Sequence, residues 1–490
     1  MRGAAFWSGF LALLLGCAPL PESRPEPSPS ASTQTSPSED WRLHPLSTPP
    51  LPEFSSTSSS SVVIRNLDPL PSFDGPLSSS SPSKASSNGL PEFGEEIPLA
   101  APLVNFVREP IPEMYRRDIR VGLTVGKRVQ NLGCDGFCRV TLEPGSRGRV
   151  SNTLRAEISG KRLILSDPEG HRYSSNTNVV RLEAWEPGGL VRLDGKNYRG
   201  ILEVGIYNGA LRVVNELPVE SYLQGVVPNE IGHLDSTMVE ALKAQAVAAR
   251  TYAYRHYLSR SSQGFDVYAD VRDQVYQGVD GESSLANQAI LASSGVVILW
   301  NHQLIEAYYH STCGGQTESV STWKRNPVPY LRPVVDLDST GAPWCALSSY
   351  ATWKYYITWG DLSRIAKRYL ATTNPEPMLN FHEIRHIKIL DRNPGGRVGR
   401  LEVSTDRGVF LVTGDKTRWF FRDPRNPEKI LPSAWFEMEQ NSQGITLRGR
   451  GFGHGIGLCQ MGARAMAKAG RNYKDILQHY YSGVELSKWQ

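Results

Sequence analysis

The stretch 216–257, ELPVESYLQGVVPNEIGHLDSTMVEALKAQAVAARTYAYRHY, decides the fold because it joins a strand-like run to a long helical pattern. The helical pattern runs from Asp235 to about Arg260, and Thr237 and Glu240 have the spacing of a capping box at its start. The segment 241–249 is rich in alanine, leucine and valine, which leaves almost no polar face. We therefore predict a helix that is buried on most sides.

Two cations interrupt this apolar helix. Lys243, Arg250 and Tyr254 follow one another at i, i+7 and i+11, so they lie on one narrow stripe. Burying a cation is costly unless it meets a carboxylate, carbonyl groups or a polar cleft. A structural ion pair and a site lined for an anion or a sugar explain the pattern equally well.

Glu230 lies in VVPNEIG, between an apolar strand-like run and the helix. Desolvation at such a position raises the pKa of a carboxylic acid and suits it to general acid catalysis. An ordinary surface glutamate is the alternative that these residues leave open.

Outside this stretch, short runs rich in valine, leucine and isoleucine alternate with turn residues. IRVGLTV, CRVTLEP, RLILSD and VVRLEAW upstream, and GRLEVSTDRGVFLVTG downstream, are typical of antiparallel strands. WGDLSRIAKRYL and the closing QMGARAMAKAGRNYKDILQHYYSG predict helices. The expected fold class is α+β with strands dominating: a β-rich part over residues 117–195, then a core domain over 196–488 with the buried helix and a C-terminal helical segment.

The N-terminal hundred residues have a different character. Residues 1–17, MRGAAFWSGFLALLLGC, fit a signal peptide, and LLGC resembles a lipobox that would make Cys17 the lipidation site. Leu15 is bulkier than is usual at that position of a lipobox, so ordinary signal cleavage is the alternative. Residues 18–100 are rich in proline and serine, so we expect a disordered linker, preceding the folded part as a tether. The expected location is therefore outside the cytoplasm, in the cell envelope or periplasm, with an N-terminal membrane anchor. The formal net charge of +4 over 490 residues gives no indication of a nucleic-acid partner.

Outside the cytoplasm the environment is oxidising, so cysteines there commonly form disulfides. Cys134 and Cys138 flank a turn in CDGFC and are one candidate disulfide, and Cys313 and Cys345 are the other. His310 and Cys313 have an H-x-x-C spacing, so a zinc site that includes Cys345 is the less favoured alternative. No other cofactor is expected.

A run of alternating glycines, GRGFGHGIGLCQMGA over residues 449–463, precedes the closing helices. Its spacing matches neither the dinucleotide fingerprint nor the P-loop, so a phosphate cradle is excluded. A backbone without side chains permits close approach, with His454 and Gln460 as the available polar groups. A tight packing turn with a satisfied histidine explains the run as well.

Five stretches in this order resemble the SpoIID/LytB family, that is, stage II sporulation protein D and the amidase enhancers. They are NELPVESYLQGVVPNEI, EALKAQAVAARTYA, DQVYQG, YYHSTCGGQTES with PYLRPVVD, and GRGFGHGIGLCQMGARAMAKAGRNYKDILQHYYSG, and they cover roughly residues 213–484. Cys459 departs from the pattern, because family members often carry serine there.

The resemblance implies a cell-envelope protein that acts on peptidoglycan glycan strands. Enzymatic members are lytic transglycosylases that prefer strands without stem peptides, and their catalytic glutamate corresponds to Glu230. Other members are described as enhancers of a murein amidase, which is the alternative function and a possible protein partner. The resemblance also suggests a set of residues that would line a cleft for sugars: Lys243, Arg250, Tyr276, His310, His454 and Gln460.

A lytic transglycosylase needs only one carboxyl group, whereas hydrolytic glycosidases generally need two. No second carboxylate has helical spacing to Glu230, and Asp235 and Asp273 are the remaining candidates for one. The pattern therefore favours chemistry with a single acid.

Overall fold

The computed structural model describes residues 118–143, 146–323, 325–373 and 381–488. The expected signal peptide over 1–17, Cys17 and the linker over 18–100 lie outside the described residues. Among the described residues, no helix combines the length and apolar character needed to cross a lipid bilayer. The α+β class is confirmed, with strands dominating, a buried central helix and helices near the C-terminus.

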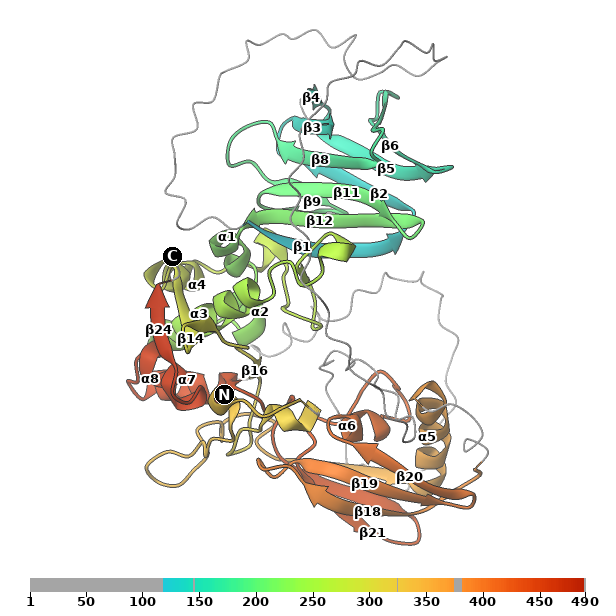
Figure 1. The fold of residues 1–490 in the computed structure, drawn as a ribbon, viewed down its shortest axis with the longest axis vertical. Helices are drawn as coiled ribbons and strands as arrows, with labels where there is room; N and C mark the ends of the chain where they lie inside the picture. Colours follow the sequence, from blue (N-terminus) through green and yellow to red (C-terminus); the bar gives the residue numbers. More distant parts are fainter. Residues whose placement is uncertain (1–117, 144–145, 324, 374–380, 489–490) are drawn as a thin grey trace, which may run out of the picture. The chain divides into compact units, whose positions relative to one another are not determined.

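Two sheets, drawn mostly in cyan and green in Figure 1, form the upstream part, and they are antiparallel except where β13 pairs in parallel with β1. The first has the order β13-β1-β12-β11-β8-β3-β4. Its strands are β1 (Asp118–Lys127), β3 (Cys138–Glu143), β4 (Ser146–Val150), β8 (Val179–Ala184), β11 (Ile201–Tyr207), β12 (Ala210–Pro218) and β13 (Val267–Tyr268). The second has the order β10-β9-β2-β5-β6-β7. Its strands are β2 (Val129–Cys134), β5 (Thr153–Ser159), β6 (Arg162–Ser166), β7 (Arg172–Ser174), β9 (Val191–Leu193) and β10 (Lys196–Tyr198).

The first sheet includes strands on both sides of the domain boundary expected at residue 195. β8 pairs with β11, placing Leu182 opposite Leu202, and β11 pairs with β12, placing Val204 opposite Val213. Side chains alternate between buried and partly exposed along β3 and β8, which is why these residues form strands with one face in the core. The division at 195 stays a prediction, and the sheet itself continues across it.

Helices pack around the buried helix α3 (Val239–Arg255), which contacts five others. They are α1 (Val219–Gln224), α2 (Val227–Ile231), α4 (Ser284–Ala292), α7 (Gln460–Lys468) and α8 (Tyr473–Tyr480). The alanine-rich segment of α3 is buried because neighbours cover it on several sides, as its composition predicts. A three-stranded sheet of β15 (Gln303–Leu304), β14 (Val296–Trp300) and β24 (Glu485–Lys488) lies beside α3.

The predicted capping box is wrong. A 3₁₀ turn over Ser236–Met238 precedes α3, and Asp235 caps that turn by accepting a hydrogen bond of 2.9 Å from Thr237 N. Glu240 instead accepts from Tyr473 N and from Lys243 Nζ. A tertiary contact with α8 therefore replaces the local interaction that the spacing suggested.

A second hydrophobic core forms within residues 353–449, which we call the inserted segment. It contains two three-stranded sheets and two helices: β17 (Trp353–Thr358), β18 (Ile384–Arg392), β19 (Val398–Thr405), β20 (Gly408–Thr413), β21 (Phe436–Gln440), β22 (Gly444–Gly449), α5 (Trp359–Thr373) and α6 (Lys416–Phe420). β16 (Tyr309–His310), before the segment, pairs in parallel with β23 (Leu458–Cys459), after it. The chain thus returns to its starting point after the insertion.

Candidate active site

The carboxyl group of Glu230 lies where four separate parts of the chain meet. The short helix α2 carries it, with Pro228 in the first turn and Gly232 at the C-terminal end. Its Oε1 accepts a hydrogen bond of 2.6 Å from Val275 N, and Tyr309 and Gln460 also hydrogen bond to the carboxyl group. The side chain is partly buried rather than extended into solvent.

Burial raises the pKa of Glu230 to about 7, although the hydrogen bonds from Val275, Tyr309 and Gln460 act in the opposite direction. Desolvation penalises the carboxylate more than the three donors stabilise it. At neutral pH both protonation states are therefore populated, which is the condition for a group that first donates and then accepts a proton.

A hydrogen-bond network holds the partners of Glu230 in place. Gln274 Nε2 donates to Tyr309 Oη at 3.1 Å, and Tyr222 Oη donates to Gln274 Oε1 at 3.1 Å. Gln460 Nε2 lies 3.4 Å from Gln245 Oε1 on α3. Tyr309 and Gln274 lie in the quoted stretches YYHSTCGGQTES and DQVYQG, but they were not predicted as site residues, because they sit far from Glu230 along the chain.

The two candidates for a second carboxylate have other roles. Asp273 is buried and accepts hydrogen bonds from Tyr252 Oη, Tyr268 N and the guanidinium of Arg260. Asp235 caps the turn before α3. Among the acids that the sequence offered, Asp273 is thus tied to a guanidinium and Asp235 to a turn, whereas burial raises the pKa of Glu230.

The cations of α3 meet carboxylates. The Arg250 side chain is 0 % exposed, and its Nε and Nη2 each lie 2.7 Å from an oxygen of Glu220, while Nη1 donates to Val296 O. Lys243 Nζ lies 2.7 Å from Glu240 Oε1. Arg250 is a structural ion-pair partner, and the expectation that it faces a ligand is corrected: its guanidinium has no exposed surface.

Tyr276 likewise belongs to the core. Its hydroxyl donates to Asn215 Oδ1 at 2.8 Å, and its ring packs against those of Tyr222 and Tyr198. The ring also fills the space beside Gly225, where a side chain would clash with it. Tyr276 therefore supports the sheet and α1, and it does not reach the surface as a sugar-lining residue would.

His310 and His454, both predicted site residues, lie side by side with ring centroids 5.6 Å apart. His310 is buried, its Nδ1 pairs with Ile456 O at 3.1 Å, and its Nε2 has no hydrogen-bond partner among the described residues. Ile456 N donates to His454 Nδ1 at 3.0 Å. Burial lowers the pKa of His454 to about 3 and that of His310 below its usual range, so both rings are neutral at pH 7.

The glycine run packs tightly around these histidines. Gly453 has φ +100°, and a Cβ there would lie 3.0 Å from His310 Cβ. Gly455 has φ +84°, and a Cβ there would clash with the guanidinium of Arg397. Of the two interpretations of the run, the packing turn is therefore the one that these contacts support directly.

Three partly exposed rings, Tyr308, Trp323 and His454, form what we call the aromatic strip. The centroid of the Trp323 ring lies 5.0 Å from that of Tyr308 and 4.9 Å from that of His454, and the last two lie 6.4 Å apart, so the three rings form a triangle. The ring of His454 also hydrogen bonds to the backbone of Tyr309, a partner of Glu230. Arg325 donates to Tyr308 Oη at 2.6 Å. No periodic pattern in the sequence predicts this strip, which forms where β16 pairs with β23 over a long distance in the chain.

Four buried side chains, Cys313, Asp336, Cys345 and Cys459, form what we call the cysteine cluster. The sulfurs of Cys313 and Cys345 lie 3.5 Å apart and are not bonded to each other. His310 is not part of the cluster, because its ring turns toward Ile456 O. The H-x-x-C spacing suggested His310 as a ligand beside Cys313 and Cys345, but Asp336 and Cys459 complete the cluster instead. Cys134 and Cys138 do form a disulfide.

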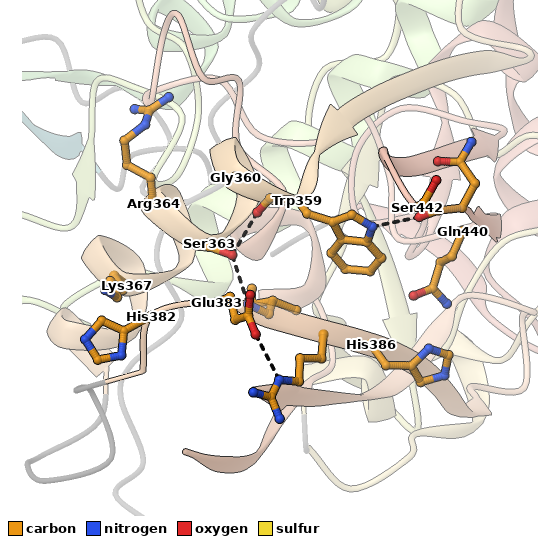
Figure 2. A pocket seen from close by; sticks show the side chains of 13 residues that line it. Trp359, Gly360, Ser363, Arg364, Lys367, His382, Glu383, His386, Gln440 and Ser442 are labelled. Carbon is orange, nitrogen blue, oxygen red and sulfur yellow. Dashed lines mark hydrogen bonds and ion pairs between the residues drawn. The ribbon is translucent and has the colours of Figure 1, made fainter. Parts of the chain in front are cut away.

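The inserted segment has a pocket of its own, with a volume of about 910 Å³ (Figure 2). Trp359 lines it, with the indole N–H donating to Asn441 O at 2.8 Å. Ser363 donates to Trp359 O and accepts from Ile384 N, joining α5 to β18 at the pocket wall. None of the site residues predicted from the sequence lines this pocket.

Comparisons with known proteins match the part of the chain around Glu230 and the inserted segment to two different families. The family described as stage II sporulation protein matches residues 207–300, which include Glu230 and α3. A domain of unknown function (DUF8618) matches residues 345–457, which contain the inserted segment.

Three relatives match between 59% and 69% of this chain. An uncharacterised protein of Brachyspira hyodysenteriae is 32% identical over 295 residues, covering 60% of this chain and 73% of the relative. Stage II sporulation protein D of Bacillus subtilis is 30% identical, covering 59% of this chain and 79% of the relative. A protein of Bacillus subtilis named amidase enhancer is 30% identical over 366 residues, covering 69% of this chain and half of the relative.

Proposed function

Because the chain belongs to the family of stage II sporulation protein D and the amidase enhancers, and so has a cell-wall-related function, we propose that it is a lytic transglycosylase. Its substrates are the glycan strands of peptidoglycan, with a preference for strands without stem peptides. The observation that carries the proposal is the carboxyl group of Glu230, partly buried, held by three hydrogen-bond donors and with a pKa of about 7.

Glu230 supplies both proton transfers in this reaction. As the acid, it donates its proton to the glycosidic oxygen that joins N-acetylmuramic acid to N-acetylglucosamine, and the bond from that oxygen to C1 of the muramyl residue breaks. The resulting carboxylate then accepts the proton of the muramyl 6-hydroxyl as its oxygen bonds to C1. The products are a free hydroxyl on one sugar and a 1,6-anhydro end on the other, and no water is consumed.

The engagement of Asp235 and Asp273 elsewhere supports chemistry with one acid. A hydrolytic glycosidase holds two carboxyl groups across the bond that it cleaves. Asp273 is bonded to Tyr252, Tyr268 and Arg260, and Asp235 caps a turn. The surroundings of Glu230 therefore suit an internal attack by the sugar better than an activated water.

The aromatic strip supports binding of a carbohydrate polymer. Flat rings provide apolar surface for the C–H faces of sugars, and the exposed Arg325 offers hydrogen bonds to hydroxyl and amide groups. Of the predicted substrate-lining residues, Gln460 contacts Glu230 and His454 belongs to the strip. His310 is buried against His454, and Lys243 is paired with Glu240 on α3. We place the glycan along the strip, with the scissile bond at Glu230.

A second candidate function is a non-catalytic module that binds peptidoglycan and stimulates an amidase. The similarity to the protein named amidase enhancer, which spans 69% of this chain, favours it. In either function the protein works in the cell envelope, and we propose that a lipid on Cys17 anchors it, with residues 18–100 as the spacer.

Digestion of denuded glycan strands distinguishes the two functions. The full chain and its Glu230→Gln variant are incubated with the strands, and mass spectrometry measures the 1,6-anhydromuramyl ends. The transglycosylase proposal predicts such ends with the wild type and none with Glu230→Gln, whereas Glu428→Gln, at an exposed site, behaves as the wild type. Strand binding without cleavage, together with faster turnover of an added murein amidase, would establish the enhancer function instead.

A further inference from the structure

The cysteine cluster gathers four potential metal ligands from segments that are distant in the sequence. Each of the four residues is at most 1 % exposed, and their ligand atoms all lie within 4.8 Å of one another. The Cys313 sulfur lies 3.0 Å from Asp336 Oδ2 and 3.5 Å from the Cys345 sulfur. A zinc ion with tetrahedral bonds of about 2.3 Å to sulfur would hold two sulfurs about 3.8 Å apart, close to this spacing.

Backbone amides are aimed at all three sulfurs. Cys313 N and Gly462 N donate to the Cys459 sulfur at 3.2 and 3.3 Å, Gly314 N donates to the Cys345 sulfur at 3.3 Å, and Gly315 N donates to the Cys313 sulfur at 3.2 Å. Neutral thiols are weak acceptors, whereas metal-bound thiolates carry charge and are stabilised by such donors. The amides therefore fit thiolates better than thiols.

Glycines make this arrangement of amides possible. Gly314 and Gly315 have φ +80° and +107°, which turns their N–H groups back toward the cysteines. At Gly462 a side chain would clash with the hydroxyl of Tyr480 and lie 2.8 Å from Asp336 Oδ2. The backbone thus approaches the cluster more closely than any residue with a Cβ would allow.

Asp336 has the surroundings of a metal-binding carboxylate. His479 Nε2 lies 2.9 Å from its Oδ1, while Oδ2 faces the Cys313 sulfur. A histidine that orients a carboxylate from outside is a recurrent second layer of metal sites. A buried carboxylate is costly unless positive charge or hydrogen-bond donors lie near it, so a cation among the three sulfurs and Asp336 would stabilise the cluster.

We propose that this cluster binds one zinc ion through the side chains of Cys313, Asp336, Cys345 and Cys459. Binding would displace the three thiol protons, and three thiolates with one carboxylate form a closed tetrahedral set of the structural type. The ion joins the loop after β16 and the segment around 336–345 to the start of α7. It therefore fixes the position of Gln460, next to Cys459, and of His310, three residues before Cys313. The metal site does not depend on the proposed function, and the tests below measure metal and thiols rather than activity.

The first test measures the wild-type chain purified without chelators. Elemental analysis by inductively coupled plasma mass spectrometry gives the zinc content, and alkylation resolved by peptide mass spectrometry gives the state of each cysteine. We expect one zinc per chain. Cys313, Cys345 and Cys459 should be alkylated without reductant, but only after unfolding with chelator, and Cys134 and Cys138 only after reduction. A disulfide between Cys313 and Cys345, or a folded chain with free thiols and no metal, would overturn the proposal.

The second test compares variants of the same loop. Asp336→Asn should weaken zinc binding at least tenfold in competition with a chromophoric chelator, whereas Asp338→Asn, at a partly exposed turn residue two positions away, should bind as the wild type. His479→Gln should weaken binding by roughly 10- to 100-fold while keeping the ligands. Cobalt bound in place of zinc should show the visible absorption of a tetrahedral thiolate site, and Cys345→Ser should lose it. Equal zinc affinity in Asp336→Asn and Asp338→Asn would contradict the assignment of Asp336.

Discussion

Replacing Glu230 by glutamine should make the protein more stable at alkaline pH. In the folded chain the pKa of Glu230 is raised from its ordinary 4.5 to about 7, mainly by burial. Below pH 4.5 the group is protonated in both the folded and the unfolded chain, so it costs nothing. As the pH rises toward 7 and beyond, the unfolded chain releases the proton first, and the folded state loses stability relative to it.

The size of this loss follows from the two pKa values. The difference between 4.5 and about 7 corresponds to about 3 kcal/mol, fully lost above the folded pKa. Glutamine has nearly the same shape, can accept the hydrogen bond from Val275 N, and does not ionise. The variant should therefore match the wild type near pH 4.5 and exceed its free energy of unfolding by about 3 kcal/mol at pH 8.

Differential scanning calorimetry at pH 5 and pH 8 provides the assay. A gain of about 3 kcal/mol raises the midpoint of the transition that includes α2 by about 4–6 °C. Glu428→Gln, at an exposed position, should shift the midpoint little at either pH. A difference between wild type and Glu230→Gln that is the same at both pH values would refute the reasoning, because packing effects do not vary with pH in this way.

Three further predictions concern the surroundings of the site. Trp323→Ala should weaken binding of denuded glycan strands in a pull-down by about tenfold, since it removes the ring that contacts both other members of the aromatic strip, while Phe137→Ala, in the exposed turn between β2 and β3, should not. Equal loss in both variants would exclude the strip from the binding site. Arg250→Met should lower the free energy of unfolding, measured by urea denaturation, by about 3 kcal/mol, because it leaves Glu220 without its ion-pair partner. Adding Glu220→Gln should recover much of this loss. A double variant no more stable than Arg250→Met would show that the unpaired charge of Glu220 does not cause the loss. Gly455→Ala should lower the free energy of unfolding by at least about 2 kcal/mol, because of its positive φ and the clash with Arg397. Gly360→Ala should be neutral, because the added Cβ meets open space. Similar stabilities of the two variants would contradict the packing role of the glycine run.

Local patterns predicted the elements well. The helical pattern from Asp235 to about Arg260 became α3, the closing stretch became α7 and α8, and the apolar runs became strands. These features depend on periodicity over neighbouring residues, which the sequence carries directly. The capping box failed because Glu240 bonds to Tyr473 N, more than two hundred positions away.

Pairings between distant segments could not be predicted. The parallel pairing of Tyr309–His310 with Leu458–Cys459 brings the glycine run to Glu230, and no local signal announces it. The same pairing places Cys459 beside Cys313. The H-x-x-C spacing instead suggested His310, whose ring faces Ile456 O and lies outside the cysteine cluster. Asp336 was missed for this reason, although it lies in the quoted run PYLRPVVD.

The most direct test of the central claim is the titration of the Glu230 side chain itself. Carbon-13 nuclear magnetic resonance of glutamate-labelled protein, with Glu230→Gln to assign the signal, follows the carboxyl carbon from pH 4 to pH 9. We predict a midpoint near 7, so that the group carries its proton for a substantial part of the time at neutral pH. A midpoint near 4.5 would mean a solvated carboxylate, and it would remove the physical basis for assigning Glu230 as the acid.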